Sequence, residues 1–210
     1  MNLLAHAYLS TPNASVLLGN MLGDDVKGMQ IKLYPPGLRV GIQLHRYIDS
    51  FTDAHPLISE IKEIFQPAVG LYSGAIVDIS MDYFLSNDSN IFTPKQWQGF
   101  ARWAYKALET QQSWHIGGFK QYFPYLVSEN WFTRYADEAF IEQSMRNLLR
   151  RVGKSAAYPT VKKQFEREQG QLAATYQAFF PLLRQHCQEK LPLLIHENGW
   201  HYETDNYLLI

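Results

Sequence analysis

Carboxylate and imidazole side chains recur at four-residue spacing in two segments of the sequence. His45, Asp49 and Asp53 lie in the segment 44–56, and Asp78 and Asp82 lie in the segment 75–85. Residues four apart share one face of an α-helix, so each set would project from one side of its helix. A histidine and a carboxylate one turn apart can hold a divalent metal or orient a water molecule. Both segments therefore predict metal ligation or acid–base chemistry.

The neighbours of Asp78 and Asp82 strengthen this interpretation, because nearly all of them are apolar. Two carboxylates stacked on a mostly buried helix repel one another unless a cation lies between them or one of them holds a proton. Helix capping is the alternative for these aspartates, and an ordinary surface pair is the alternative for His45 and Asp49.

A glycine-rich segment, residues 19–28, supplies a third set of polar residues. On a helix, Asn20, Asp24 and Lys27 would line one stripe. Gly19 and Gly23 would each weaken that helix by up to about 1 kcal/mol unless another backbone or a ligand packs closely against it. The alternative is an amphipathic helix whose polar residues face solvent.

His6 lies among apolar residues near the start of the chain, where a lone histidine is usually a core residue. His6 becomes a candidate metal ligand only because the other segments supply carboxylates and an imidazole that could bind the same ion. Nitrogen and oxygen donors brought together from four helices would suit Mn²⁺, Mg²⁺ or Fe²⁺, and would also accept Zn²⁺. Such a centre can hydrolyse phosphate esters, with Lys27 and Arg46 neutralising the phosphate. The predicted ligands are His6, Asp24, His45, Asp49, Asp78 and Asp82.

The segments that must position these side chains are all predicted to be helices. No strand-like alternation persists, and we expect an all-α, single-domain bundle (1–210) of about seven to nine helices. The expected helices are 2–10, 14–27, 38–54, 57–66, 70–86, one opened by Thr93-Pro94, one after Gly117-Gly118, 130–152, and 159–190 with a kink near Pro181; the tail after Pro192 is expected to be irregular.

The composition excludes several classes of protein. Of 210 residues, 46% are hydrophobic and 19% charged, which excludes a disordered chain. A net charge of −1 argues against nucleic-acid binding driven by bulk charge. The single cysteine, Cys187, excludes a disulfide framework and a cysteine-rich metal site. No apolar run reaches the roughly 20 residues of a membrane span, and no signal peptide is evident, so we expect a cytoplasmic protein without a membrane partner.

Four ordered blocks within about the first 86 residues resemble the acyl carrier protein phosphodiesterase family. They are 1–6, 19–28, 41–56 and 78–85. Residues 87–210 fit in length and helical character but carry no comparably specific motif.

The resemblance implies a divergent, HD-domain-like helical phosphohydrolase. Members hydrolyse the phosphodiester that joins 4′-phosphopantetheine to a serine of holo-acyl carrier protein, and they need a divalent metal, typically Mn²⁺. Carried onto this chain, the catalytic residues would be Asp24, His45, Asp49 and Asp82, and the metal ligands His6, Asp24, His45, Asp78 and Asp82. The phosphate-binding or supporting residues would be Lys27, Arg46, Asp53 and His55.

Three positions depart from the family pattern. Tyr83 stands where members often have histidine, which would alter the centre if that histidine ligates metal. Tyr72 and Ser73 precede Gly74, where a basic residue is common, and Asp25 replaces a usually apolar residue.

A basic cluster in the second half suggests a surface for the acidic carrier protein. It consists of Arg146, Arg150, Arg151 and Lys154 at the end of the helix 130–152. The alternative is a solvated helix end whose positive charges are favoured by the helix dipole. Two other functions stay open: hydrolysis of a small nucleotide or other phosphoester, and carrier-protein binding by a catalytically inactive relative.

Overall fold

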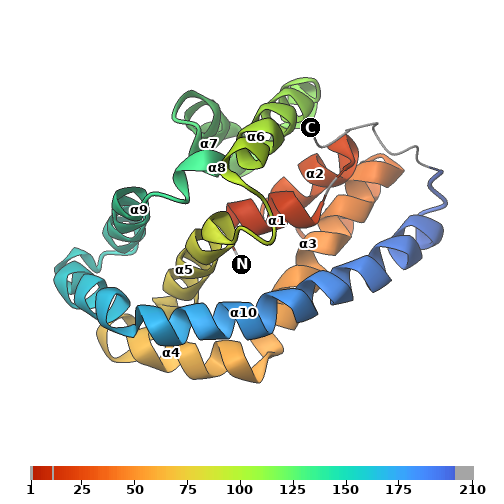
Figure 1. Cartoon of the computed structure of the whole chain (residues 1–210). Helices are drawn as coiled ribbons and strands as arrows, with labels where there is room; N and C mark the ends of the chain where they lie inside the picture. The colour runs from red at the N-terminus through yellow and green to blue at the C-terminus, as the bar shows by residue number, and fades with distance from the viewer. Residues whose placement is uncertain (1, 11, 202–210) are drawn as a thin grey trace.

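The computed structural model describes residues 2–10 and 12–201 of the chain. Within these residues the chain forms ten α-helices and four short 3₁₀ helices, with no strand (Figure 1). The prediction of an all-α bundle is confirmed. The α-helices are α1 (Leu3–Leu9), α2 (Ala14–Met21), α3 (Pro36–Ala54), α4 (Pro56–Val69), α5 (Ser73–Asn87), α6 (Pro94–Glu109), α7 (Gly117–Ser128), α8 (Trp131–Arg134), α9 (Glu138–Arg151) and α10 (Tyr158–Glu197). The 3₁₀ helices are η1 (Gly28–Leu33), η2 (Gly70–Tyr72), η3 (Gln112–Trp114) and η4 (Ser155–Ala157).

The helix starts follow the local sequence signals. The Asn13 side chain accepts hydrogen bonds from the backbone N–H groups of Ser15 and Val16 and so caps α2. Thr93 and Gln96 form the capping box that opens α6, with Pro94 at its first position.

Three predicted boundaries were wrong. The helix expected over 14–27 ends at Met21, because the chain turns at Gly23 against the ring of His45. The helix expected over 130–152 is divided into α8 and α9, and the Asp137 side chain caps α9 by accepting from the backbone N–H of Ala139. The tail after Pro192 is helical to Glu197, because the burial of Leu194 in the core holds this last part of α10 in place.

The long helix α10 runs across one side of the molecule and packs against α3, α4 and α5 (Figure 1). Helix α2 lies beside α3, and α6 packs on α2 and on the short α8. Helices α7 to α9 form the opposite side of the molecule from the α2–α3 pair (Figure 1). The core between these helices is apolar and rich in buried phenylalanine rings.

The contact between α2 and α3 depends on two glycines. A Cβ atom on Gly19 would overlap the carbonyl oxygen of Leu38 and lie 2.9 Å from the Cα of Gly41. A Cβ atom on Gly41 would overlap the carbonyl oxygen of Val16 and lie 2.7 Å from the backbone nitrogen of Asn20. The two backbones therefore touch directly, which explains why glycine occupies the interior of both helices despite its low helix propensity.

One helical stretch, Pro56–Asn87, is long and apolar enough to cross a membrane by length and composition alone. It comprises α4, η2 and α5. Both helices pack on α10 as well as on each other, so their apolar faces are used inside the bundle.

We predict that Gly41→Ala destabilises the fold by about 1–3 kcal/mol, because the added methyl group must separate α2 from α3. Urea denaturation measures the change. Gly170→Ala is the matched control: Gly170 lies inside α10 with open space around it. This control should gain about 0.5–1 kcal/mol from helix propensity. Equal changes in the two variants would contradict the close contact.

Candidate metal centre

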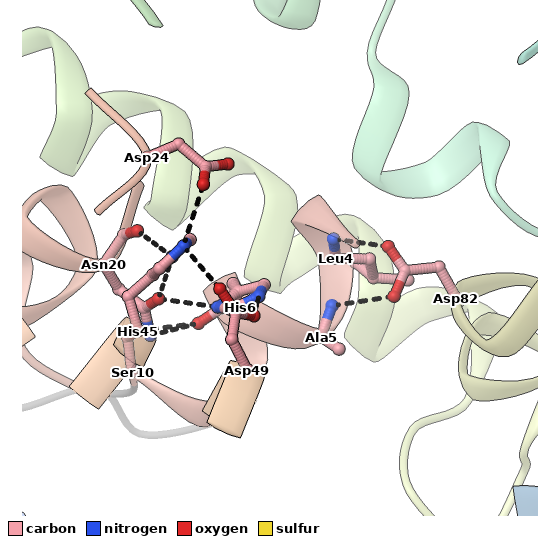
Figure 2. Close-up of polar contacts among 9 residues, drawn as sticks. All are labelled: Leu4, Ala5, His6, Ser10, Asn20, Asp24, His45, Asp49 and Asp82. Atoms are coloured by element: carbon pink, nitrogen blue, oxygen red, sulfur yellow. Dashed lines mark hydrogen bonds and ion pairs between the residues drawn. The ribbon is translucent and has the colours of Figure 1, made fainter. Parts of the chain in front are cut away.

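Two histidines and one aspartate form a compact set of metal-ligating atoms. His6 comes from α1, and His45 and Asp49 come from adjacent turns of α3. The Nε2 atoms of His6 and His45 lie 3.2 and 3.0 Å from the two carboxylate oxygens of Asp49 (Figure 2). The two rings are stacked, with centroids 4.3 Å apart. The three candidate ligand atoms all lie within 4.8 Å of one another, close enough to share one ion.

Asn20 fixes the orientation of both imidazole rings. Its side-chain oxygen lies 2.7 Å from Nδ1 of His6, and its backbone oxygen lies 2.8 Å from Nδ1 of His45. Carbonyl oxygens only accept hydrogen bonds, so both Nδ1 atoms carry the proton and both Nε2 atoms point towards Asp49. Ligating histidines typically donate their other N–H to an oxygen in this way.

The amide of Asn20 is itself held in place. Its nitrogen donates to the backbone oxygen of His6 at 3.1 Å and to the hydroxyl of Ser10 at 2.7 Å. These two bonds distinguish the amide nitrogen from the oxygen that faces the rings. Asn20 is fully buried, so the orientation of both histidines is set inside the protein.

The protonation of the centre reflects the balance between burial and charge. Burial disfavours the charged form of Asp49, but the two imidazoles outweigh it and hold its pKa well below the usual range. Burial also opposes the charged form of His45, but the neighbouring carboxylates of Asp24 and Asp49 raise its pKa to about 9. Burial lowers the pKa of His6. The two carboxylates therefore favour positive charge at Nε2 of His45, the position that a cation would take.

A buried nitrogen without a hydrogen bond supports a metal at this place. Nε2 of His45 is buried and has no partner at an acceptable hydrogen-bond angle, although Asp49 lies 3.0 Å away. A nitrogen that faces a carboxylate without hydrogen bonding to it is suited to sharing a cation with that carboxylate. The set of two imidazoles and one carboxylate fits a divalent transition metal with open coordination positions.

The centre lies in a cleft of about 270 Å³ that contains three further predicted acids. Asp24 lies in the turn after α2, with its side chain 88% exposed and Oδ1 3.5 Å from Nε2 of His45. Asp53 and Asp78 also line the cleft, from α3 and α5. The full lining is Asn2, Leu3, His6, Asn20, Met21, Asp24, His45, Asp49, Thr52, Asp53, Asp78 and Tyr122.

Asp82 occupies a different place from the one predicted for a ligand. It is fully buried, and its two oxygens accept hydrogen bonds from the backbone N–H groups of Leu4 at 2.8 Å and Ala5 at 3.2 Å (Figure 2). Burial raises the pKa of Asp82 to about 7, against the effect of these two bonds. The geometry gives Asp82 the capping role that the sequence left as the alternative. It supports the start of α1 and acts on the centre through His6.

Three of the residues predicted to bind or support the phosphate already have partners within the protein. Arg46 donates to the backbone oxygen of Val26 at 3.0 Å and so anchors the turn that carries Asp24. Nδ1 of His55 accepts from the backbone N–H of Leu57 and caps α4. Asp53, at the cleft, pairs with Lys62 at 2.8 Å.

Lys27 is exposed and immediately precedes η1. Tyr83 packs edge-on against Phe84 and Phe165 and is not part of the cleft lining. The replacement at position 83 therefore lies outside the centre.

Two functional positions were missed or misjudged from the sequence. Asn20 was expected on a polar stripe with Asp24 and Lys27, and no contact with the histidines was predicted for it, whereas it is buried and hydrogen-bonds to both rings. Tyr122 lines the cleft from α7, where no motif indicated a site. Helical spacing relates residues within one helix and carries no information on what α7 contributes.

We predict that Asn20→Ala lowers Mn²⁺ affinity by about 10- to 100-fold without removing a ligand, as loss of a supporting hydrogen bond does at other metal sites. Isothermal titration calorimetry on folded protein measures the change. Asn147→Ala is the matched control, because Asn147 is exposed on α9 and lies outside the cleft lining. An Asn20→Ala protein with wild-type affinity would contradict the orienting role.

The chain is similar to known proteins over most of its length. A model of the acyl carrier protein phosphodiesterase family matches residues 1–183. The acyl carrier protein phosphodiesterase of Yersinia pestis is 30% identical over 191 residues, covering 90% of this chain and 99% of the relative. That of Photorhabdus laumondii is 29% identical over 191 residues, covering 90% and 96%. That of Salmonella agona is 34% identical over 152 residues, covering 72% and 79%. No solved structure matches. The match thus extends well beyond the first 86 residues, and the chain belongs to the acyl carrier protein phosphodiesterase family.

Proposed function

We propose that this protein hydrolyses the phosphodiester between 4′-phosphopantetheine and a serine of holo-acyl carrier protein. The products are apo-carrier protein and 4′-phosphopantetheine. The observation that carries the proposal is the family match over residues 1–183, which includes every residue of the cleft. The cleft itself offers an arrangement of donors suited to a metal-dependent phosphodiesterase.

We propose that His6 and His45 hold a divalent metal through Nε2, together with a carboxylate oxygen of Asp49. Mn²⁺ is the first choice for this mixed nitrogen and oxygen set, and Mg²⁺ and Fe²⁺ are the alternatives. A bound ion would supply Lewis-acid polarisation of a phosphoryl oxygen and would acidify water. Asp24 and Asp78 lie in the same cleft and are further candidate ligands.

Asp24 is the proposed proton acceptor for the attacking water. Its carboxylate is exposed at the mouth of the cleft, 3.5 Å from Nε2 of His45. An aspartate is ionised at neutral pH, and the contact with His45 lowers the pKa of Asp24 further, so the place of this carboxylate beside the centre, and not raised basicity, is what suits it to accept a proton. Arg46 holds the turn that carries Asp24. Lys27, one residue beyond Val26, is proposed to face the phosphate.

The basic cluster defined in the sequence is the proposed docking surface for the acidic carrier protein. Arg150, Arg151 and Lys154 are exposed at the corner between α9 and α10 (Figure 1). Arg146 stacks over the ring of Tyr158, with its guanidinium carbon 4.4 Å from the ring centroid. Complementary charge at such a surface would mainly accelerate encounter with the partner. We also propose a cytoplasmic location, which this soluble partner would require.

We predict that incubation with Mn²⁺ converts holo-acyl carrier protein to apo-protein, as measured by intact-protein mass spectrometry. A chelator should abolish the conversion, and so should His45→Ala, which removes a proposed ligand. His196→Ala is the control, because His196 lies in the last turn of α10, outside the cleft. Metal binding without conversion would favour a small nucleotide or phosphoester substrate. Absence of both would favour an inactive binding relative.

We predict that Arg150→Glu combined with Arg151→Glu raises KM for holo-acyl carrier protein by about 10-fold at low salt, because charge reversal opposes an acidic partner. Hydrolysis of a small chromogenic phosphodiester should not change. Lys95→Glu combined with Arg102→Glu, on exposed positions of α6, is the charge-matched control. Equal effects on both substrates would contradict a docking role.

A further inference from the structure

Helix α7 is fastened to the turn that carries Asp24 by the neighbouring residue, Asp25. The two oxygens of Asp25 accept hydrogen bonds from the backbone N–H groups of Gly118 at 2.8 Å and Phe119 at 2.9 Å. Gly117 has a positive φ of 50°, and a Cβ atom there would overlap Oδ1 of Asp25. The first turn of α7 is thus shaped to receive this carboxylate, which also complements the positive end of the helix.

Tyr122 lies one turn beyond Gly118 and lines the metal cleft. Its ring stacks on Trp131 with centroids 6.1 Å apart and planes 14° apart, and it meets Phe119 edge-on at 5.4 Å. These contacts hold the ring from two sides. The ring is therefore held at a defined place beside the cleft, on an element that contributes none of the candidate metal ligands.

The cleft has few groups that can donate a hydrogen bond to an anion. Apart from the two histidines and Asn20, the donor side chains among the described lining residues are Asn2, Thr52 and Tyr122. Asn2 already donates to the hydroxyl of Tyr135 at 3.3 Å, and the hydroxyl of Thr52 is buried from solvent. The other polar lining residues are carboxylates, which repel a phosphodiester. Among these three lining side chains, Tyr122 is thus the donor that remains available to the substrate.

We propose that Tyr122 is a substrate-contacting residue whose hydroxyl donates a hydrogen bond to a phosphoryl oxygen of the phosphodiester, and that Asp25 is its positioning residue. This inference rests on the proposed function for the identity of the substrate. Asp25 acts through the backbone of α7 and is not itself part of the cleft lining.

Steady-state kinetics with holo-acyl carrier protein and saturating Mn²⁺ tests the role of the hydroxyl. Tyr122→Phe should lower kcat/KM by about 10-fold or more, the usual effect of losing a donor to a developing charge. The dissociation constant for Mn²⁺, measured by calorimetry, should stay unchanged. Tyr125→Phe is the matched control, because Tyr125 is on the same helix and 59% exposed. Wild-type kcat/KM in Tyr122→Phe would overturn the proposal.

A double-mutant cycle tests the positioning role. Asp25→Ala should lower kcat/KM in the wild-type background and have little further effect in Tyr122→Phe, because it acts through the same hydroxyl. Asp25→Asn, which keeps one acceptor oxygen, should restore part of the loss. Additive effects of Asp25→Ala and Tyr122→Phe would overturn the link between the two residues.

Binding of inorganic phosphate separates this inference from the proposed function. The Mn²⁺-loaded wild-type protein should bind phosphate more tightly than Tyr122→Phe by about 5-fold or more, as measured by calorimetry. If the wild type binds phosphate in this way but does not hydrolyse holo-acyl carrier protein, the proposed substrate fails and the role of Tyr122 stands. Equal affinities, or no phosphate binding by either protein, would overturn the role of Tyr122.

Discussion

The direct backbone contact between α2 and α3 is the constraint on which the rest of the site depends. Gly19 and Gly41 allow the two helices to touch, and Asn20 follows immediately after the first of these glycines. The contact brings the backbone oxygen of Asn20 to 2.8 Å from His45, one turn beyond Gly41. A side chain larger than hydrogen at either glycine would separate the helices. The ring tautomers are therefore a consequence of how closely two helices pack.

The position of the second histidine, His6, depends on contacts from two other helices. His6 is carried by α1, a helix of seven residues, which is too short to be stable by itself. Its first turn is bound by the carboxylate of Asp82 from α5, and its fourth residue, His6, is bound by Asn20 from α2. Tertiary hydrogen bonds at its first turn and at its middle residue thus provide stability that α1 lacks by itself. Asp82 therefore holds the start of the helix that carries His6.

The sequence predicted the helical class, and the acids and histidines that line the cleft are all among the residues it singled out, because four-residue spacing reports which side chains share a helix face. His45, Asp49 and Asp53 lie together as that spacing implies. Spacing carries no information on which face meets another helix, so the buried contacts of Asn20 were not predicted and Asp82 was assigned to the centre. Helical spacing also does not predict that α2 ends at Met21. The chain turns at Gly23 against the ring of His45, which comes from a distant segment of the sequence.

Asp24 and Asp25 are adjacent carboxylates with opposite orientations, one towards the cleft and the other towards the start of α7. A motion of α7 away from the cleft must either break two hydrogen bonds or move Asp24 with the helix. While these two hydrogen bonds hold, α7 stays attached to the turn that carries Asp24. Amide hydrogen exchange at Gly118 and Phe119 would report how often α7 separates from this turn, because both N–H groups donate to the residue next to Asp24.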